Sequence, residues 1–198
     1  GDYVRSALKR GLSMEQEFGQ NPYQFGMIGS TDAHTGMASA EEDNFWGKLA
    51  TDSIPENKSR QWSGGEQKAP DGWSMSASGL AAVWAEENTR EAILAAMQRR
   101  EVYATSGPRI SLQFYGGNGL DGIDLDSAEL YRQATAAGVP MGGELGASDT
   151  APTFIVVAAK DPMGANLDRI QIVKGWLDSS GEQHEQVFDV SWSGDRAI

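Results

Sequence analysis

The sequence predicts a mixed α/β segment over residues 1–109, followed by a mainly-β unit over residues 110–198 that forms a small sandwich. The first observation is a change of period. Apolar residues have helical spacing before residue 109, and alternate with polar residues after it. The second observation is charge. Residues 1–110 carry 11 Lys and Arg against 15 Asp and Glu, net −4, whereas residues 111–198 carry 5 against 13, net −8. The more acidic second part indicates a separate unit.

The first elements are a helix, a turn and a strand. Asp2 can cap a short helix that Gly11 would stop. Asn21-Pro22 is a turn signal. Phe25–Gly29 then has the pattern of a short buried strand, which would carry the segment Ser30–His34 at its C-terminal end.

Residues 50–78 are rich in Ser, Gly, Pro and charge, and they contain two tryptophans. A connection of this length without regular structure is usually an active-site lid or a disordered segment, and the sequence leaves both open.

A second helix is expected after Asn88. Asn88–Glu91 is a capping-box arrangement, in which the side chain of residue 88 or 89 accepts hydrogen bonds from free amides of the first turn. Arg99 and Arg100 stand where cations suit the C-terminus of a helix. Glu101–Thr105 has β character, and Ser106–Pro108 turns the chain. Later strands are expected around Ile110, Leu112 and Phe114, over Phe154–Ala159, around Ile170–Val173 and over Phe188–Trp192.

The composition is that of a globular protein with an acidic surface. Hydrophobic residues make up 39% and charged residues 22% of the chain, and the formal net charge is −12. Such a charge repels phosphate backbones and anionic lipids, so nucleic acid and membrane surfaces are not expected as partners. The absence of cysteine excludes disulfides, thiolate nucleophiles and cysteine-ligated zinc. No apolar run approaches the roughly 20 residues of a membrane span, so membrane insertion is not expected.

The ends of the chain predict an excised fragment of a longer protein. The chain begins at Gly1 rather than Met, and Trp192–Ile198 completes no evident element. The sequence therefore carries no evidence on targeting.

The first candidate for chemistry is Asp32-Ala33-His34. If it follows a strand, residues i and i+2 point the same way, so the carboxylate of Asp32 and the imidazole of His34 converge. These donors suit zinc, manganese or iron, and a metal held there could lower the pKa of a bound water and polarise a phosphoryl or carbonyl oxygen. The alternative is an Asp that caps a turn beside a surface His, and spacing alone favours that alternative.

The second candidate is a basic cluster. Arg99, Arg100 and Arg109 flank Thr105–Gly107 and could bind an anionic group such as phosphate, with Arg100 and Arg109 as the substrate-binding candidates. The alternative, which we favour, is an ordinary basic helix end. Ser106 is not expected to be a nucleophile, because the chain has no Gly-x-Ser-x-Gly motif.

Other patterns have plainer explanations. Glu41–Asp43 is expected to be a solvated acidic loop, and Asp121, Asp124 and Asp126 lack the spacing of an EF-hand. Six tryptophans suggest a carbohydrate platform, but Trp84, Trp176 and Trp192 sit in apolar patterns typical of a core.

Long segments carry a family resemblance: Tyr3–Leu12, Asn21–Tyr23, Phe25–Gly36, Ser78–Arg90, Arg99–Arg109, Gly138–Gly143 and Ile170–Trp176. Together they cover most of the chain and resemble domain-of-unknown-function family 3604 (DUF3604). That family is similar to the polymerase and histidinol phosphatase (PHP) superfamily of metal-dependent phosphoesterases, which have a distorted (β/α) barrel. The resemblance implies that residues 1–109 are the C-terminal part of such a barrel.

The resemblance also implies a role for the first candidate. Asp32 and His34 match the last metal-binding motif of the superfamily, a Gly-Ser-Asp-x-His-like segment, with Thr31 inserted. The early His-x-His motif has no match, because the chain contains only two histidines, His34 and His184. A multi-metal cluster cannot be assembled from this chain alone.

The expected function is therefore that of a metal-dependent hydrolase in the longer protein, with a small-molecule ester or phosphoester as substrate and zinc, manganese or iron as the divalent metal. The chain itself is expected to be inactive and to bind metal weakly or not at all. The rival hypothesis is that residues 110–198 recognise a glycan or a protein, or only brace the barrel. Relatives of this kind are often exported, which favours the periplasm or the outside of the cell.

Overall fold

A computed structural model describes residues 3–36, 48–49, 54, 56 and 79–195. The chain forms two compact units, one from Gly1–Phe25 and Ala165–Ile198 and the other from Gly26–Gly164. In the described part of the chain, no helix is long and apolar enough to cross a membrane.

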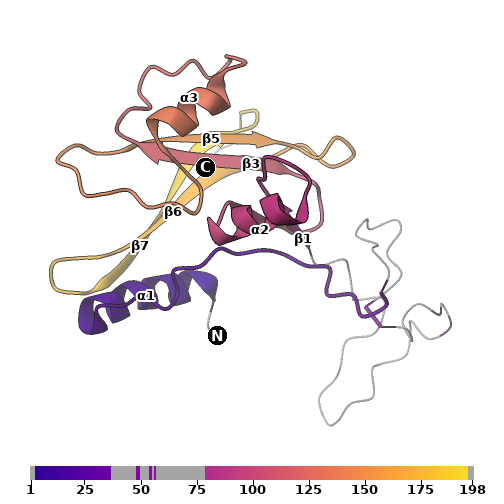
Figure 1. Cartoon of the computed structure of the whole chain (residues 1–198), viewed down its shortest axis with the longest axis horizontal. Helices are drawn as coiled ribbons and strands as arrows, with labels where there is room; N and C mark the ends of the chain where they lie inside the picture. The colour runs from indigo at the N-terminus through magenta and orange to yellow at the C-terminus, as the bar shows by residue number, and fades with distance from the viewer. Residues whose placement is uncertain (1–2, 37–47, 50–53, 55, 57–78, 196–198) are drawn as a thin grey trace, which may run out of the picture. The chain divides into compact units, whose positions relative to one another are not determined.

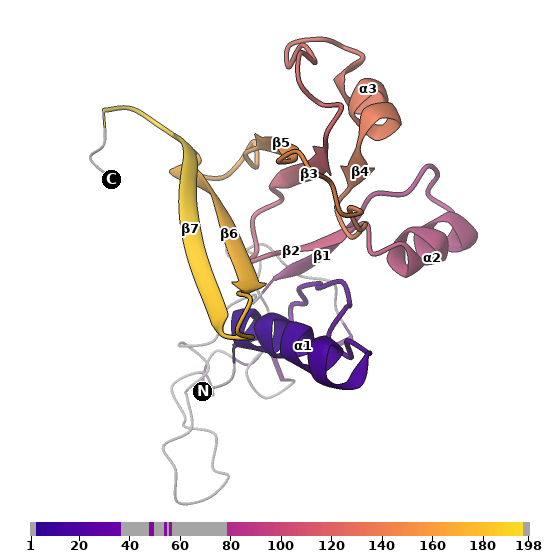
Figure 2. The ribbon, with the colours of Figure 1, turned by 90° about the vertical axis from the view of Figure 1, so that its left-hand side faces the viewer.

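The first unit consists of one helix and one hairpin. Helix α1 (Val4–Phe18) lies against the antiparallel strands β6 (Arg169–Leu177) and β7 (Gln183–Trp192), near the turn that joins them (Figure 2). The contacts between them are partly polar. Lys9 Nζ lies 3.1 Å from Glu185 Oε2, and Gln183 Nε2 donates a hydrogen bond of 2.8 Å to Ser13 Oγ.

Gly11 does not stop this helix, contrary to the prediction. It is buried inside α1, which continues to Phe18 and ends at Gly19, whose φ of 74° is left-handed. A Cβ atom on Gly11 would lie 2.2 Å from Asn21 Oδ1 and 3.0 Å from Tyr23 Cβ. Gly11 is therefore needed for the close return of the following segment, although glycine has a low helix propensity.

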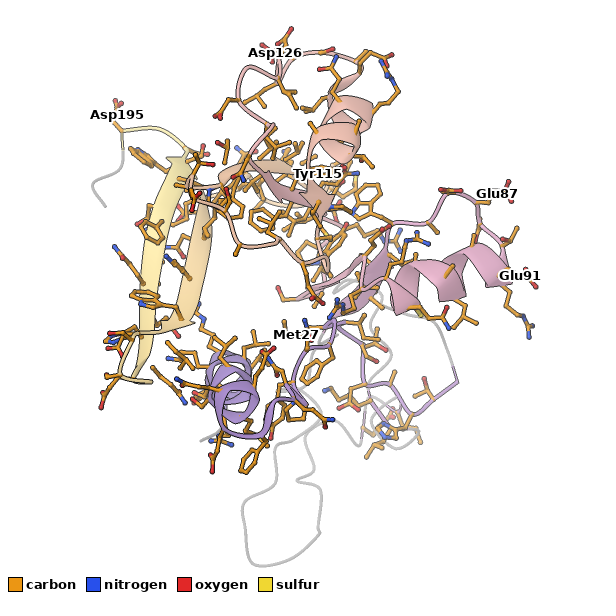
Figure 3. All side chains as sticks on the ribbon, turned by 60° about the vertical axis from the view of Figure 1, so that its left-hand side comes forward. Met27, Glu87, Glu91, Tyr115, Asp126 and Asp195 are labelled. Atoms are coloured by element: carbon orange, nitrogen blue, oxygen red, sulfur yellow. The ribbon has the colours of Figure 1, made fainter. Side chains whose placement is uncertain are left out.

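The second unit has its core between a sheet and a helix. Strands β4 (Val139–Pro140), β3 (Ser111–Gly117) and β5 (Thr153–Ala159) form an antiparallel sheet in that order. Helix α3 (Leu130–Ala137), which the sequence pattern did not predict, lies beside β3 and β5 (Figure 1). Tyr115, Leu120, Leu130, Ala134 and Ile155 form the buried cluster between them, and side chains crowd around Tyr115 in Figure 3.

A hairpin with an inserted helix completes the second unit. Strands β1 (Leu80–Val83) and β2 (Val102–Thr105) pair antiparallel, and α2 (Arg90–Gln98) lies between them in the chain. The Oγ1 of Thr89 accepts a 3.3 Å hydrogen bond from the amide of Ala92, which confirms the predicted cap. Trp84 Nε1 donates to the carbonyl of Leu112 at 2.8 Å, so the hairpin is tied to β3.

The mixed α/β class is confirmed, and so are the strands predicted near residues 102–105, 111–117, 153–159, 169–177 and 183–192. All pairings are antiparallel within small sheets, and the described residues form no closed barrel. The sandwich is only loosely matched: β3 and β5 build their core against α3, while β6 and β7 belong to the other compact unit. The division at residues 109 and 110 stays a prediction.

The buried strand predicted over Phe25–Gly29 is wrong. These residues form neither helix nor strand, and Phe25, Met27 and Ile28 are 48%, 38% and 56% exposed. Met27, labelled in Figure 3, lies on this irregular segment. The apolar run alone does not predict a strand here, because a buried strand also needs neighbouring strands on both sides.

Candidate functional site

The segment that carries Asp32 and His34 is held against the end of the β1–β2 hairpin. A Cβ atom on Gly29 would lie 2.7 Å from the carbonyl oxygen of Leu80 and 2.9 Å from that of Thr105. Leu80 and Thr105 are directly paired residues of the two strands. Gly79 is closer still, since its Cβ would lie 2.3 Å from the Thr105 oxygen. Only glycine fits at position 29, because any side chain would collide with these oxygens. This close approach places the start of the segment Ser30–His34 at the end of the hairpin.

Two hydroxyl groups shape the turn that follows. Ser30 Oγ accepts a 3.2 Å hydrogen bond from the amide of Asp32, and Thr31 Oγ1 accepts one of 3.3 Å from the amide of Ala33. Such bonds to the amide two residues ahead favour tight turns. Asp32 has a φ of +56°, one of two non-glycine residues with positive φ among those described. Its conformation is uncommon, although Asp tolerates it better than most residues.

The backbone of Asp32 holds the imidazole of His34. Nδ1 of His34 lies 3.0 Å from the carbonyl oxygen of Asp32. A carbonyl oxygen only accepts hydrogen bonds, so this contact requires a proton on Nδ1 and leaves the lone pair of the neutral ring on Nε2. Histidines that bind metals are usually held in this way, with the other ring nitrogen donating to a carbonyl or carboxylate.

Lys48 contacts both residues of the pair. Its Nζ lies 3.1 Å from Asp32 Oδ2, and its backbone oxygen accepts a 2.6 Å hydrogen bond from the amide of His34. The Lys48 side chain is 21% exposed, whereas that of Asp32 is 62% exposed. Lys48 could not be predicted from the sequence, because a lysine 16 residues from Asp32 matches no motif spacing.

These residues fit part of a metal centre. Asp32 and His34 could supply an oxygen and an imidazole nitrogen from one turn, and the contact at Nδ1 leaves Nε2 as the ring nitrogen that could bind. In the described ranges, however, no three His, Cys, Asp or Glu side chains are grouped as a metal ion would need. The pair thus supplies two donors, and further ligands would have to come from elsewhere.

The comparison with protein families is unambiguous. The profile of the family described as "Protein of unknown function (DUF3604)" matches residues 1–198. The chain belongs to the DUF3604 family. No curated protein matches this DUF3604 chain, and no solved structure does.

Two arginines of the predicted basic cluster in this DUF3604 chain pair with carboxylates. Arg99 Nε lies 2.9 Å from Glu101 Oε1, and this hydrogen bond raises the pKa of Arg99. Arg100 pairs with Glu144 at 2.8 Å. This contact agrees with the plain helix-end interpretation, and a substrate-binding role for Arg100 stays a prediction.

Arg109 is placed by its backbone. Its amide donates a 2.7 Å hydrogen bond to Asp161 Oδ2, and this bond, with a second from the amide of Met163, lowers the pKa of Asp161. Arg109 also lines an open groove with Leu80, Tyr103 and Ile110. Binding of an anion by Arg109 stays a prediction.

The second histidine of the DUF3604 chain also faces an aspartate, which the sequence did not predict. His184 Nε2 lies 2.7 Å from Asp178 Oδ2 at the turn end of β6 and β7. Hydrogen bonds from the hydroxyl of Ser180, from His184 and from the amide of Glu182 lower the pKa of Asp178 well below its usual value. The ring of His184 also stacks on Trp176, with centroids 5.4 Å apart.

On this hairpin, Trp192 does not form an aromatic row with Phe188, as a carbohydrate platform there would need. Trp84 and Trp176 are half-buried, but Trp192 is 48% exposed, so its predicted place in a core is wrong. Phe188 pairs with Ile172, and Trp192 pairs with Arg169 across a bulge between residues 170 and 171. The bulge reverses the alternation of side chains, so Phe188 and Trp192 lie on opposite faces.

The remaining candidates are the acidic residues of the loop before α3 and those near residue 42. Asp121 and Asp124 are used locally: Asp121 Oδ1 accepts from Thr153 Oγ1 at 2.8 Å, and Asp124 Oδ1 accepts from the amide of Asp126 at 3.0 Å. Asp126 stands out from the loop before α3 in Figure 3, as a solvated turn would. Glu41–Asp43 and most of residues 50–78 lie outside the described residues.

Proposed function

We propose that Asp32 and His34 are two ligands of a divalent-metal centre in a hydrolase that acts on a phosphoester or a related ester. The remaining ligands come from the longer protein, in which residues 1–109 of this DUF3604 chain form the C-terminal part of a PHP-like barrel. The metal is zinc, manganese or iron, the ions that a carboxylate and an imidazole suit best.

The observation that supports this proposal is the contact between His34 Nδ1 and the carbonyl oxygen of Asp32 at 3.0 Å. It leaves Nε2 as the ring nitrogen that could bind a metal, and the carboxylate of Asp32 comes from the same turn. The unusual φ of Asp32 adds to it, because backbone strain is often retained at functional sites.

Each residue of the turn has a role in this proposal. Asp32 supplies negative charge and one oxygen, His34 supplies Nε2, and the hydroxyls of Ser30 and Thr31 keep the turn closed. A bound divalent ion would act as a Lewis acid toward an ester oxygen and lower the pKa of water. Two ligands leave most of the coordination shell to water, so we expect the chain alone to bind metal weakly and not to catalyse.

Metal binding is tested on the chain itself with Mn²⁺, whose paramagnetism broadens nearby NMR signals even when binding is weak. We expect the imidazole signals of His34 to broaden first, with His184 as the internal reference. Asp32→Ala should remove this preference, and Asp124→Ala, which removes another exposed carboxylate, should not. Equal broadening of both histidines in the unaltered chain would overturn the proposal.

Hydrolysis is tested on the longest protein that contains this chain, with a chromogenic phosphomonoester and Mn²⁺. Loss of residues that only orient a metal ligand typically costs 10–100-fold in metal affinity or activity. We therefore expect His34→Ala to lower the rate by at least about 100-fold, and His184→Ala to leave it near that of the unaltered protein. Equal rates for both variants would contradict the proposal.

A further inference from the structure

We propose that Lys48 is a built-in competitor of the metal ion: its ammonium group neutralises Asp32 in the metal-free chain and must leave that carboxylate when a divalent ion binds. This inference rests on the proposed function, because it describes the regulation of the same site.

The first step is the position of Lys48. Its Nζ lies 3.1 Å from Asp32 Oδ2, and its backbone oxygen accepts the amide proton of His34 at 2.6 Å. The main-chain bond holds residue 48 beside the pair whatever its side chain does. The ammonium group therefore stays close to the carboxylate at a high local concentration.

The second step is charge. An ammonium group has three donors and no acceptor, so protonated Lys48 cannot itself be a metal ligand. A metal ion would bind the same carboxylate at about 2.0–2.2 Å. The two cations would then lie within a few ångströms of each other, and their repulsion favours one or the other on Asp32.

The third step is the difference in exposure. Asp32 is 62% exposed, so a cation can reach its carboxylate from solvent without opening the turn. The side chain of Lys48 is 21% exposed and flexible, so its ammonium group can turn from the carboxylate while its backbone keeps the bond to His34. Metal binding is thus expected to free the side chain of Lys48 without unfolding the turn, and by linkage the ion pair lowers metal affinity.

The test compares the Mn²⁺ affinity at His34 of the unaltered chain with that of Lys48→Met, which keeps the length of the side chain and removes its charge. Ion pairs with a solvent-exposed partner, as Asp32 is, contribute up to about 1 kcal/mol, which corresponds to a change of roughly fivefold. We expect Lys48→Met to bind Mn²⁺ about fivefold more tightly, and the difference to shrink at high salt, because salt screens exposed charges.

Two variants control for other effects. Lys48→Arg keeps the charge and should bind Mn²⁺ like the unaltered chain. Lys174→Met removes a lysine from the first unit, where Nζ lies 5.0 Å from the ring centre of Trp176, and should have no effect at His34.

The outcomes separate the two proposals. If Lys48→Met binds Mn²⁺ at His34 no more tightly than the unaltered chain, Lys48 is not a competitor, and the metal-ligand proposal stands. If neither chain shows preferential broadening of His34, the metal-ligand proposal itself fails.

Discussion

The two histidines of this chain both face an aspartate, but the pairs are built in opposite ways. In the turn at Asp32 the backbone carbonyl holds Nδ1 of His34, and the carboxylate pairs with Lys48. In the hairpin the carboxylate of Asp178 itself holds Nε2 of His184. In the first arrangement the backbone carbonyl of Asp32, and not its carboxylate, contacts the histidine. In the second, the carboxylate of Asp178 contacts the histidine and closes the turn.

The difference shows that residue types alone do not define a site. Asp178 accepts hydrogen bonds from the amides of Ser180 and Glu182 and from the hydroxyl of Ser180, so its carboxylate is engaged by the backbone it organises. Among the described residues of the turn around Asp32, no amide donates to its carboxylate, and the hydroxyls of Ser30 and Thr31 accept the amide hydrogen bonds instead. A carboxylate that its own turn does not need is the better candidate for a ligand.

The largest expected effect concerns the support of the Asp32 turn. Gly29→Ala places a Cβ atom within 3 Å of two carbonyl oxygens, those of Leu80 and Thr105, and backbone atoms cannot move aside as a flexible side chain can. We expect a loss of about 1–3 kcal/mol in the free energy of unfolding, measured by urea denaturation. Gly146→Ala is the control, because a Cβ atom there has no neighbour within 4 Å. Equal stability of both variants would show that the turn does not depend on this approach.

The next effect concerns acid and the hairpin. The pKa of Asp178 is lowered in the folded chain, so its stabilising contribution is present above the unfolded value of about 3.9 and is lost as the pH falls through the lower folded pKa. We expect amide exchange in β6 and β7, corrected for its intrinsic pH dependence, to lose protection progressively below about pH 4. Asp178→Asn should show weaker protection and no such loss at acid pH. If the variant still lost protection at acid pH, another carboxylate would be responsible.

The smallest effect is expected at Asp32 itself. Asp32→Gly loses an exposed ion pair and relieves a left-handed backbone, two contributions of opposite sign that are each about 1 kcal/mol. We therefore expect the free energy of unfolding to stay within about 1 kcal/mol of its original value while the Mn²⁺ response of His34 disappears. Arg100→Gly is a matched control, since Arg100 also combines a positive φ with an ion pair, and it should leave His34 unchanged. A large loss of stability in Asp32→Gly would make Asp32 a structural residue like Asp178.

Much of the fold could be predicted because its signals are local. The cap at Thr89, the strand over Val102–Thr105 and the alternating pattern before Phe114 depend on near neighbours in the chain. The helix Leu130–Ala137 was missed because its amphipathic pattern is short and has no side-chain cap. Gly11 and Phe25–Gly29 were misread because their roles depend on residues that approach from elsewhere.

The candidate site was predicted in part for the same reason. Asp32 and His34 lie two residues apart and form a recognisable motif. Lys48 and the supporting oxygens of Leu80 and Thr105 are distant in sequence, and no spacing rule connects them to the motif. The pairing of Asp178 with His184 depends on the register of the hairpin, which turn geometry sets only after the strands have formed.

The approach of Gly29 to Leu80 and Thr105 also has a consequence for folding order. Those two residues become neighbours only when β1 and β2 pair, with α2 enclosed between them in the chain. Gly29 then has to close a loop of about 75 residues to reach Thr105, and long loops are closed late because their entropy cost comes before their contacts. The Asp32 turn is therefore expected to be among the last parts of its unit to form and the first to open by local unfolding. In a refolding experiment, the signals of His34 should reach their native positions after those of the Tyr115 core.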